Sequence, residues 1–262
     1  MSNIGLFDSG VGGLSVLRAV ARELPVYDLV YFADQKYCPY GSRPAQEIRA
    51  LSKRITEFLI SENCRIIVVA CNTASAAALY FLRETFPHIQ FVGMEPAVKP
   101  AALATRTGKV AVLATPGTLD GELFTRTRDE HAREVQVFTV YPDDWVARVE
   151  RGDIASPETE MSVRRVLEPL LEQGVDMIVL GCTHYPFLAP LMKKIAQGDA
   201  MLIDPSDAVA LRTASIVFDQ HSPEIQDRRG ALAFYTSGDA RTFERLVRQL
   251  IRVVAPAQQR LA

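Results

Sequence analysis

The sequence predicts an α/β fold made of two pseudosymmetric α/β domains with mostly parallel sheets. Short apolar runs alternate along the chain with segments of helical periodicity, an order that typically gives parallel sheets with helices on both faces. An apolar run that ends in a cysteine occurs twice, at 66–71 and at 177–182, which indicates a repeated unit. Pro96 and Pro100 interrupt the pattern, and a new strand-and-turn series follows them. We therefore expect two domains with an active site in the cleft between them.

The first part of the chain predicts four strands and three helices. β-Branched and aromatic residues dominate the short apolar runs, as in buried strands, and apolar residues recur at helical spacing between these runs. A loop with prolines and a glycine at 35–44 separates the second strand from the second helix. The predicted strands are 4–7, 29–33, 66–70 and 91–94, and the predicted helices are 14–23, 45–61 and 74–85.

The second part of the chain repeats this order of elements. The strand at 109–115 resembles the opening strand, and the turn at 116–118 resembles the turn that follows it. We expect residues 1–97 to form the first domain, 98–207 to form the second, and 208–262 to return to the first. The further predicted strands are 135–140, 177–180, 201–203 and 232–235, and the further helices are 119–131, 145–150, 158–173, one ending near 196, 208–219 and 240–253.

The composition is that of a globular protein that binds neither nucleic acid nor a membrane. The 262 residues are 48% hydrophobic, enough for a large core, and the net charge of −2 does not favour nucleic acid or an anionic membrane. No apolar run approaches the ~20 residues of a transmembrane helix, and no basic or apolar leader precedes the first strand. We expect a cytoplasmic protein with four reduced cysteines. No C-x-x-C or H-E-x-x-H pattern indicates a metal site.

Two cysteines, Cys71 and Cys182, occupy equivalent places in the two halves. Each follows a buried strand, and ligands bind at the carboxyl ends of strands in open α/β sheets. Polar residues come next, Asn72-Thr73 after the first cysteine and Thr183-His184 after the second. A single cysteine is most often a small buried apolar residue. The matched pair with polar neighbours instead indicates one site with a thiol on each side.

A glycine-rich turn at 8–13 follows the first strand. It offers free backbone N–H groups to an anion, but it departs from nucleotide motifs, because Ser15 stands where a glycine is needed and no G-K-[ST] is present. Asp8 at the strand end is either a helix cap or a carboxylate that faces the site. In the next loop, Tyr40 within 39–41 either belongs to a plain turn or lies over the cleft.

Two facing thiols suit a reaction that removes a proton from carbon and replaces it on the opposite face. One acts as a thiolate base and the other as a thiol acid, and a helix N-terminus after each strand favours the thiolate. Asp8 and His184 can carry or orient the proton. The strand-end segments contain no Lys or Arg, so neutral groups and backbone dipoles would hold a carboxylate substrate. Motifs for pyridoxal phosphate, nucleotide, flavin or metal are absent, which favours cofactor-independent epimerisation of an α-carbon.

Four motifs together resemble those of the glutamate racemases of bacterial cell-wall synthesis. They are FDSGVGG at 7–13, PYG at 39–41, ACNTAS at 70–75 and GCTHYP at 181–186, and the likeness covers nearly the whole chain. The resemblance implies two pseudosymmetric α/β domains, a homodimer, and interconversion of L- and D-glutamate without a cofactor. It also implies that D-glutamate supplies peptidoglycan synthesis.

The same resemblance implies roles for individual residues. Cys71 corresponds to the base for D-glutamate and Cys182 to the base for L-glutamate. Asp8, His184 and Glu150 correspond to residues that assist the thiols. The residues expected to contact the substrate are Asp8, Ser9, Pro39, Tyr40, Gly41, Asn72, Thr73, Thr115, Thr183 and His184.

Three other functions are compatible with the residues alone. A racemase for aspartate or a hydantoin would share the two thiols. A two-domain binding protein would close on a small anion without exchanging its α-proton. A cysteine hydrolase would use one thiol–histidine pair, form a covalent acyl-enzyme, and leave Cys71 idle.

Overall fold

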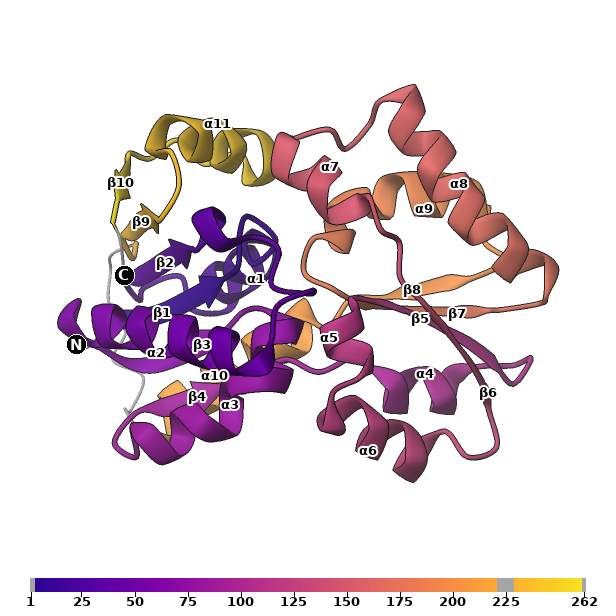
Figure 1. Ribbon diagram of the computed structural model, residues 1–262, viewed down its shortest axis with the longest axis horizontal. Coiled ribbons are helices and arrows are strands. Elements are labelled where there is room, and N and C mark those ends of the chain that lie inside the picture. Colours follow the sequence, from indigo (N-terminus) through magenta and orange to yellow (C-terminus); the bar gives the residue numbers. More distant parts are fainter. Residues whose placement is uncertain (1–2, 221–228, 261–262) are drawn as a thin grey trace.

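Two parallel sheets form the centre of the computed structural model, which describes residues 3–220 and 229–260 (Figure 1). Within these residues the first sheet has six strands in the order β10-β9-β2-β1-β3-β4, and the second has four in the order β6-β5-β7-β8. All neighbouring strands are parallel, which confirms the predicted fold class. The strands are β1 (Asn3–Asp8), β2 (Leu29–Ala33), β3 (Cys64–Val69), β4 (Gln90–Val92), β5 (Lys109–Ala114), β6 (Gln136–Val140), β7 (Met177–Gly181), β8 (Met201–Ile203), β9 (Leu232–Thr236) and β10 (Ala257–Gln259).

Helices cover both faces of each sheet, as parallel sheets require. Around the first sheet, α1, α10 and α11 pack on one face and α2 and α3 on the other. Around the second, α7, α8 and α9 pack on one face and α4 and α6 on the other. None of the helices in the described ranges is long and apolar enough to cross a membrane. The helices are α1 (Leu14–Glu23), α2 (Ala45–Ser61), α3 (Asn72–Thr85), α4 (Val98–Ala104), α5 (Pro116–Leu119), α6 (Glu122–His131), α7 (Trp145–Arg151), α8 (Pro157–Glu172), α9 (Ala189–Ala196), α10 (Ser206–Gln220) and α11 (Ala240–Ile251).

The two sheets share a four-stranded unit, because the order β2-β1-β3-β4 corresponds to β6-β5-β7-β8. Val69 at the end of β3 pairs with Phe7 of β1, and Leu180 of β7 pairs with β5 in the corresponding register. Two residues beyond these positions the chain reaches Cys71 and Cys182. The two cysteines therefore occupy equivalent positions of a repeated unit.

The C-terminal strands β9 and β10 belong to the first sheet. There β9 pairs with β2, and α10 packs against α1. In Figure 1 the helix α11, drawn in yellow, reaches from this domain to α7 of the other. Gln249 of α11 donates a hydrogen bond of 2.6 Å from Nε2 to the carbonyl of Gly152, the residue that ends α7. The end of the chain thus contacts the helix that carries Glu150.

A continuous cluster of buried apolar side chains extends through both domains. It includes Val11 after β1, Trp145 in α7 and Tyr185 after β7. The rings of Trp145 and Tyr185 meet edge-on, with their centroids 5.1 Å apart. Burial of this surface holds the two sheets together with their carboxyl ends facing one another.

The structure differs from the sequence prediction in several elements. The helix expected over 119–131 begins only at Glu122, because the preceding Gly121 has an extended backbone, and the turn expected at 116–118 forms the short helix α5 instead. The prediction lacks α4, in which Pro100 lies in the first turn, a position that proline tolerates. It also lacks β10, whose Ala-Gln-Gln sequence has no apolar alternation. The loop at 35–44 contains a short 3₁₀ turn over Gln35–Tyr37.

Candidate active site

A closed pocket lies between the two domains at the carboxyl ends of β1, β3, β5 and β7. Both thiols line it, Cys71 from the first domain and Cys182 from the second. Its open volume is about 20 Å³, enough for about one water molecule, so a larger ligand requires the pocket to open. Val146 is the one described lining residue that the sequence did not predict. The predicted residues that line it with the thiols are Ser9, Pro39, Tyr40, Gly41, Asn72, Thr73, Thr115, Thr183 and His184.

Cys71 is the N-cap residue of α3. Its Sγ accepts a hydrogen bond of 3.4 Å from the backbone N–H of Ala74, and Ser9 Oγ lies 3.9 Å away. The helix N-terminus favours a thiolate at this position. Burial nevertheless raises the pKa of Cys71 far above its usual range, and the nearby Asp8 carboxylate raises it further. In the closed pocket Cys71 is therefore a neutral thiol, the form that donates a proton.

His184 connects the second thiol to Glu150. Its Nδ1 lies 3.7 Å from Cys182 Sγ, and its Nε2 lies 2.6 Å from Glu150 Oε1. Burial lowers the pKa of His184, but hydrogen bonds with Cys182, Cys38 and Glu150 outweigh burial and hold this pKa well above its usual value. Burial raises the pKa of Glu150, and the bond to His184 more than offsets this, so the pKa is lowered. His184 is therefore a cationic imidazole whose Nδ1 faces the Cys182 sulfur.

Glu150 extends from α7 of the second domain to the first domain. Its Oε1 accepts a hydrogen bond of 2.7 Å from the backbone N–H of Val11, and its Oε2 accepts one of 3.1 Å from Gln35 Nε2. The glutamine is itself held, because Thr236 Oγ1 donates to its Oε1 at 3.0 Å. Both carboxylate oxygens thus have partners, which restricts the carboxylate to one orientation beside His184.

The glycine-rich turn at 8–13 leaves room for the His184–Glu150 pair. A Cβ atom on Gly10 would lie 1.9 Å from Glu150 Oε1, and one on Gly12 would lie 2.5 Å from His184 Nδ1. Both distances are far shorter than van der Waals contact, so a larger residue at either position displaces the pair. The glycines that suggested an anion-binding turn are therefore needed for close approach of side chains from the other domain.

Asp8 lies fully buried behind the pocket lining. Its Oδ1 accepts hydrogen bonds from the Gly10 N–H (2.7 Å) and Ser9 Oγ (3.1 Å), and its Oδ2 accepts one from Thr183 Oγ1 (2.8 Å). The N-cap of α1 is Gly13, which has no side-chain cap, so Asp8 is not the cap of that helix. Burial raises the pKa of Asp8 to about 6, although the nearby imidazole and the donors oppose the shift.

The raised pKa predicts how Asp8→Asn changes stability with pH. Because the ordinary pKa is 3.8 and the folded value is about 6, the contribution of Asp8 to stability is present at acidic pH and is lost as the pH rises through about 6. Asparagine does not ionise and avoids this loss. We expect the variant to gain stability relative to the wild type between about pH 4 and pH 7, by about 3 kcal/mol at most. Thermal unfolding at both pH values measures it, and a constant difference in Tm would contradict it.

Threonine hydroxyls meet across the pocket from the two domains. Thr73 Oγ1 of α3 lies 2.8 Å from Thr115 Oγ1, which lies 3.0 Å from Thr118 Oγ1. Beside them the Gly117 N–H donates a hydrogen bond of 3.2 Å to the carbonyl of Gly41. These bonds close the pocket on this side, and they place neutral donors near the two thiols.

Asn72 and Tyr40 have different surroundings in the pocket wall. The amide oxygen and nitrogen of Asn72 are buried and have no hydrogen-bond partner among the described residues. A buried amide without a partner is costly unless a ligand or water satisfies it, which indicates that Asn72 is a ligand-binding group. Tyr40 is buried rather than directed outward, and its hydroxyl donates to Asp34 at 2.5 Å. Ser237 Oγ donates to the same carboxylate at 2.6 Å, so the loop is anchored to the end of β9.

Comparison with known proteins identifies the family. Residues 4–213 match the family model described as Asp/Glu/Hydantoin racemase. The chain belongs to this family. A curated glutamate racemase from Roseiflexus sp. (strain RS-1) is 48% identical, over 94% of this chain and 91% of the relative. Another, from Pseudomonas aeruginosa (strain UCBPP-PA14), is 45% identical over 93% of this chain and 92% of the relative.

Solved glutamate racemases have the same two-domain fold as this racemase-family chain. The Escherichia coli enzyme, in complex with L-glutamate and the activator UDP-MurNAc-Ala, matches with a TM-score of 0.86 and 31% identity, covering 100% of this chain and 99% of that one. The RacE1 isoform from Bacillus anthracis matches with a TM-score of 0.85 and 30% identity, covering 99% and 97%. The predicted family and fold are confirmed, whereas the roles of single residues stay predictions.

Three residues near the racemase-family site are missing from the sequence prediction. Gln35 contacts Glu150, Val146 lines the pocket, and the Cys38 sulfur lies within 4.8 Å of an imidazole nitrogen of His184. Gln35 follows the carboxyl end of β2, so the strand-end argument that identified the cysteines could have identified it as well. The other two carry no such signal, because the fold alone brings a helix and a loop to the pocket.

We expect Gln35→Leu to lower kcat about tenfold, because Glu150 loses one charge-assisted hydrogen bond and with it a fixed orientation. KM should change little, since Gln35 does not line the pocket. Thr236→Val removes only the donor that holds Gln35 and should have a smaller effect in the same direction. Steady-state racemisation measures both variants. A tenfold rise in KM with an unchanged kcat would show that Gln35 does not act through Glu150.

Proposed function

We propose that this protein is a glutamate racemase that interconverts L- and D-glutamate by proton transfer between two thiols. One observation carries the proposal: Cys71 and Cys182 come from equivalent positions of two related domains and line the same pocket. Curated relatives named glutamate racemase support the choice of reaction. Glutamate racemase structures with D-glutamate or L-glutamate support the choice of substrate.

The two thiols exchange roles between the directions of the reaction. From L- to D-glutamate, the Cys182 thiolate removes the α-proton, so that an S–H bond forms as the C–H bond breaks. The electron pair stays on the α-carbon, and the Cys71 thiol protonates this carbon on the opposite face, leaving a Cys71 thiolate. The reverse direction begins with that thiolate. The starting form returns when the Cys182 thiol releases its proton and the Cys71 thiolate takes one up, both by exchange with solvent, while the cationic His184, held by Glu150, stays beside Cys182.

The wall of the pocket suits a carbanion that no cofactor stabilises. Such an intermediate depends on hydrogen bonds in a site that excludes water. The described residues that line the pocket include no Lys or Arg. The carboxylates of the substrate would therefore accept hydrogen bonds from neutral groups such as Asn72 and Thr183 and from backbone N–H groups. Because the pocket holds about one water molecule, the domains or their loops must separate to admit glutamate.

Incubation with D-glutamate in deuterated water tests the proposal. We expect L-glutamate that carries deuterium at the α-carbon, measured by chiral chromatography and proton NMR. A variant with both Cys71→Ser and Cys182→Ser controls for contaminating racemase. A folded wild-type protein that forms no L-glutamate would contradict the proposal.

Parallel incubations distinguish the other functions that share this site. Faster turnover of aspartate or a hydantoin would move the assignment to another substrate of the family. Binding of glutamate without α-proton exchange would indicate a binding protein. A covalent acyl-enzyme in the mass spectrum would indicate a cysteine hydrolase.

We further propose that the protein is a cytoplasmic homodimer and that its D-glutamate supplies peptidoglycan synthesis. Membership of the racemase family supports these proposals. The proposed first domain comprises 1–97 and 208–262, and the second comprises 98–207. The places of β9 and β10 in the first sheet support this division, and α10 begins at Ser206, close to the proposed boundary. Analytical ultracentrifugation tests the dimer, and a monomer at all concentrations would contradict it.

A further inference from the structure

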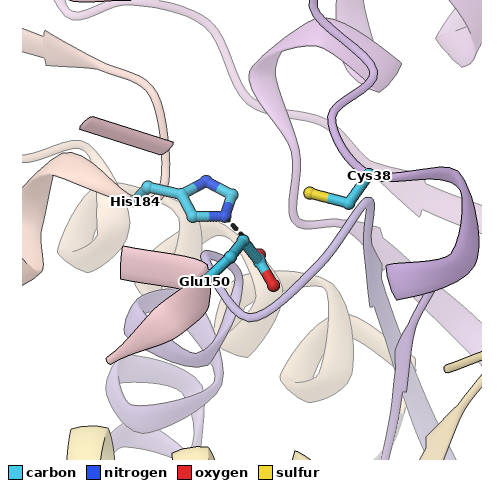
Figure 2. A group of neighbouring side chains, drawn as sticks. All are labelled: Cys38, Glu150 and His184. Carbon is cyan, nitrogen blue, oxygen red and sulfur yellow. Dashed lines mark hydrogen bonds and ion pairs between the residues drawn. The ribbon is translucent and has the colours of Figure 1, made fainter. Parts of the chain in front are cut away.

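Cys38, Glu150 and His184 form a cluster beside the pocket that the proposed racemisation uses only in part. One sulfur, one carboxylate oxygen and one imidazole nitrogen from these residues all lie within 4.8 Å of one another. Figure 2 shows the Cys38 sulfur directed toward the imidazole and the carboxylate. The ion pair accounts for Glu150 and His184, whereas the thiol has no role in proton transfer to the substrate. The cluster therefore contains a potential ligand group, the Cys38 thiol, that the proposed racemisation does not use.

The three donors are those that Zn²⁺ prefers. Zinc binds thiolate, imidazole and carboxylate together, and three protein ligands leave a fourth position for water. Calcium and magnesium prefer oxygen ligands alone. Bond lengths of about 2.0–2.3 Å around a tetrahedral ion place the donor atoms roughly 3.2–3.8 Å apart. Small side-chain movements therefore bring the cluster to this geometry.

Neighbouring groups already orient the three donors. Gln35 Nε2 holds Glu150 Oε2 at 3.1 Å, and the second imidazole nitrogen of His184 faces Cys182 at 3.7 Å. Such partners of the ligands fix their orientation in metal sites. Cys38 is half-buried, and the side chain of Glu150 is 16% exposed, so an ion can reach the cluster from solvent.

We propose that Cys38, Glu150 and His184 bind Zn²⁺ or a similar thiolate-preferring cation, and that the bound ion inhibits racemisation. The thiol proton of Cys38 and the proton between His184 and Glu150 leave to solvent as the ion binds. The ion takes the place of the Nε2 proton and so replaces the 2.6 Å hydrogen bond between His184 and Glu150. Both side chains move toward the ion and Cys38, so the imidazole no longer keeps its position beside Cys182 Sγ. Ion binding does not depend on the proposed function, whereas the inhibition rests on the proposed function.

Cobalt(II) titration of the metal-free full-length protein tests the binding without using activity. We expect thiolate-to-cobalt charge-transfer absorption that one equivalent of Zn²⁺ abolishes. Cys38→Ser should lose this absorption, whereas Cys64→Ser, a matched buried cysteine at the start of β3, should retain it. Absorption that persists in Cys38→Ser would assign the ion to the other thiols and overturn the proposal, as would no absorption in the wild type.

Zinc titration of racemisation tests the inhibition. We expect Cys38→Ser to racemise glutamate and to require on the order of 100-fold more Zn²⁺ for half-inhibition, because one ligand is lost. Cys64→Ser should be inhibited like the wild type. Equal inhibition of Cys38→Ser and wild type would overturn the inhibitory role. A wild type without racemase activity would contradict the proposed function instead, and the cobalt titration would still decide whether the site exists.

Discussion

Replacing either Cys71 or Cys182 by serine should lower kcat/KM for both enantiomers by on the order of 10³-fold or more. A serine hydroxyl is a far weaker acid than a thiol, so it supplies neither the base nor the acid of the proposed mechanism at neutral pH. The loss should be equal in the two directions, because the enantiomers have equal free energy and their interconversion has a fixed equilibrium. Circular dichroism of glutamate follows the reaction from each enantiomer.

Proton exchange in the same variants assigns each thiol to one face of the substrate. Cys182→Ser retains the thiol that removes the proton of D-glutamate, so it should exchange deuterium into D-glutamate without inversion. Cys71→Ser should do the same with L-glutamate. Cys64→Ser is the control. This buried cysteine lies at the start of β3, the strand that leads to Cys71, and it does not line the pocket. Wild-type racemisation by either single variant, or the opposite exchange pattern, would contradict the two-thiol mechanism.

The second large effect is expected from His184→Asn, which should lower kcat/KM by about 10²-fold. Asparagine retains a polar group near the position of Nδ1 but loses Nε2, which lies 2.6 Å from Glu150 Oε1. The cation beside Cys182 is therefore lost, and Glu150 is left with a buried charge and two donors rather than three. The acidic limb of the pH–rate profile should change as well, because His184 and Glu150 titrate as a pair.

His88→Asn is the matched control for this prediction, because His88 is exposed in the loop after α3. It should retain wild-type rates and the wild-type pH profile. Unchanged kinetics in a folded His184→Asn variant would show that the imidazole takes no part in proton transfer. A rise in KM without a fall in kcat would assign His184 to substrate binding instead.

The two cysteines illustrate what local pattern can predict. Each lies two residues beyond the last paired apolar position of a strand, and the polar residues after it form part of the same short segment. Strand-end position in a parallel sheet is encoded by residues close together in the chain. For the same reason the bounds of α1, β2, α2 and β8 coincide with the prediction.

For Asp8 and Tyr40 the sequence pattern allowed two interpretations, and the structure decides between them. The sequence allowed Asp8 to be a helix cap, but its carboxylate accepts a hydrogen bond from Thr183 of the other domain. It also allowed Tyr40 to belong to a plain turn, but the side chain lines the pocket and its hydroxyl donates a hydrogen bond to Asp34. In both cases the alternatives differ in which residues, distant in the sequence, the side chain contacts. The residues next to Asp8 or Tyr40 in the chain do not determine those contacts.

The sequence alone thus predicts the alternation of strands and helices, the repeated half and the thiols at the strand ends, because each of these depends on residues that are neighbours in the chain. The relay around His184 was not, because its parts come from separate segments. Glu150 is 139 residues from Val11 and 115 from Gln35, yet hydrogen bonds join it to both. Such contacts form only when burial of the shared apolar cluster brings the domains together. That packing places Glu150 in the space beside Gly10 and lets it bond to Gln35. It also brings the Cys38 thiol close to Glu150 and His184.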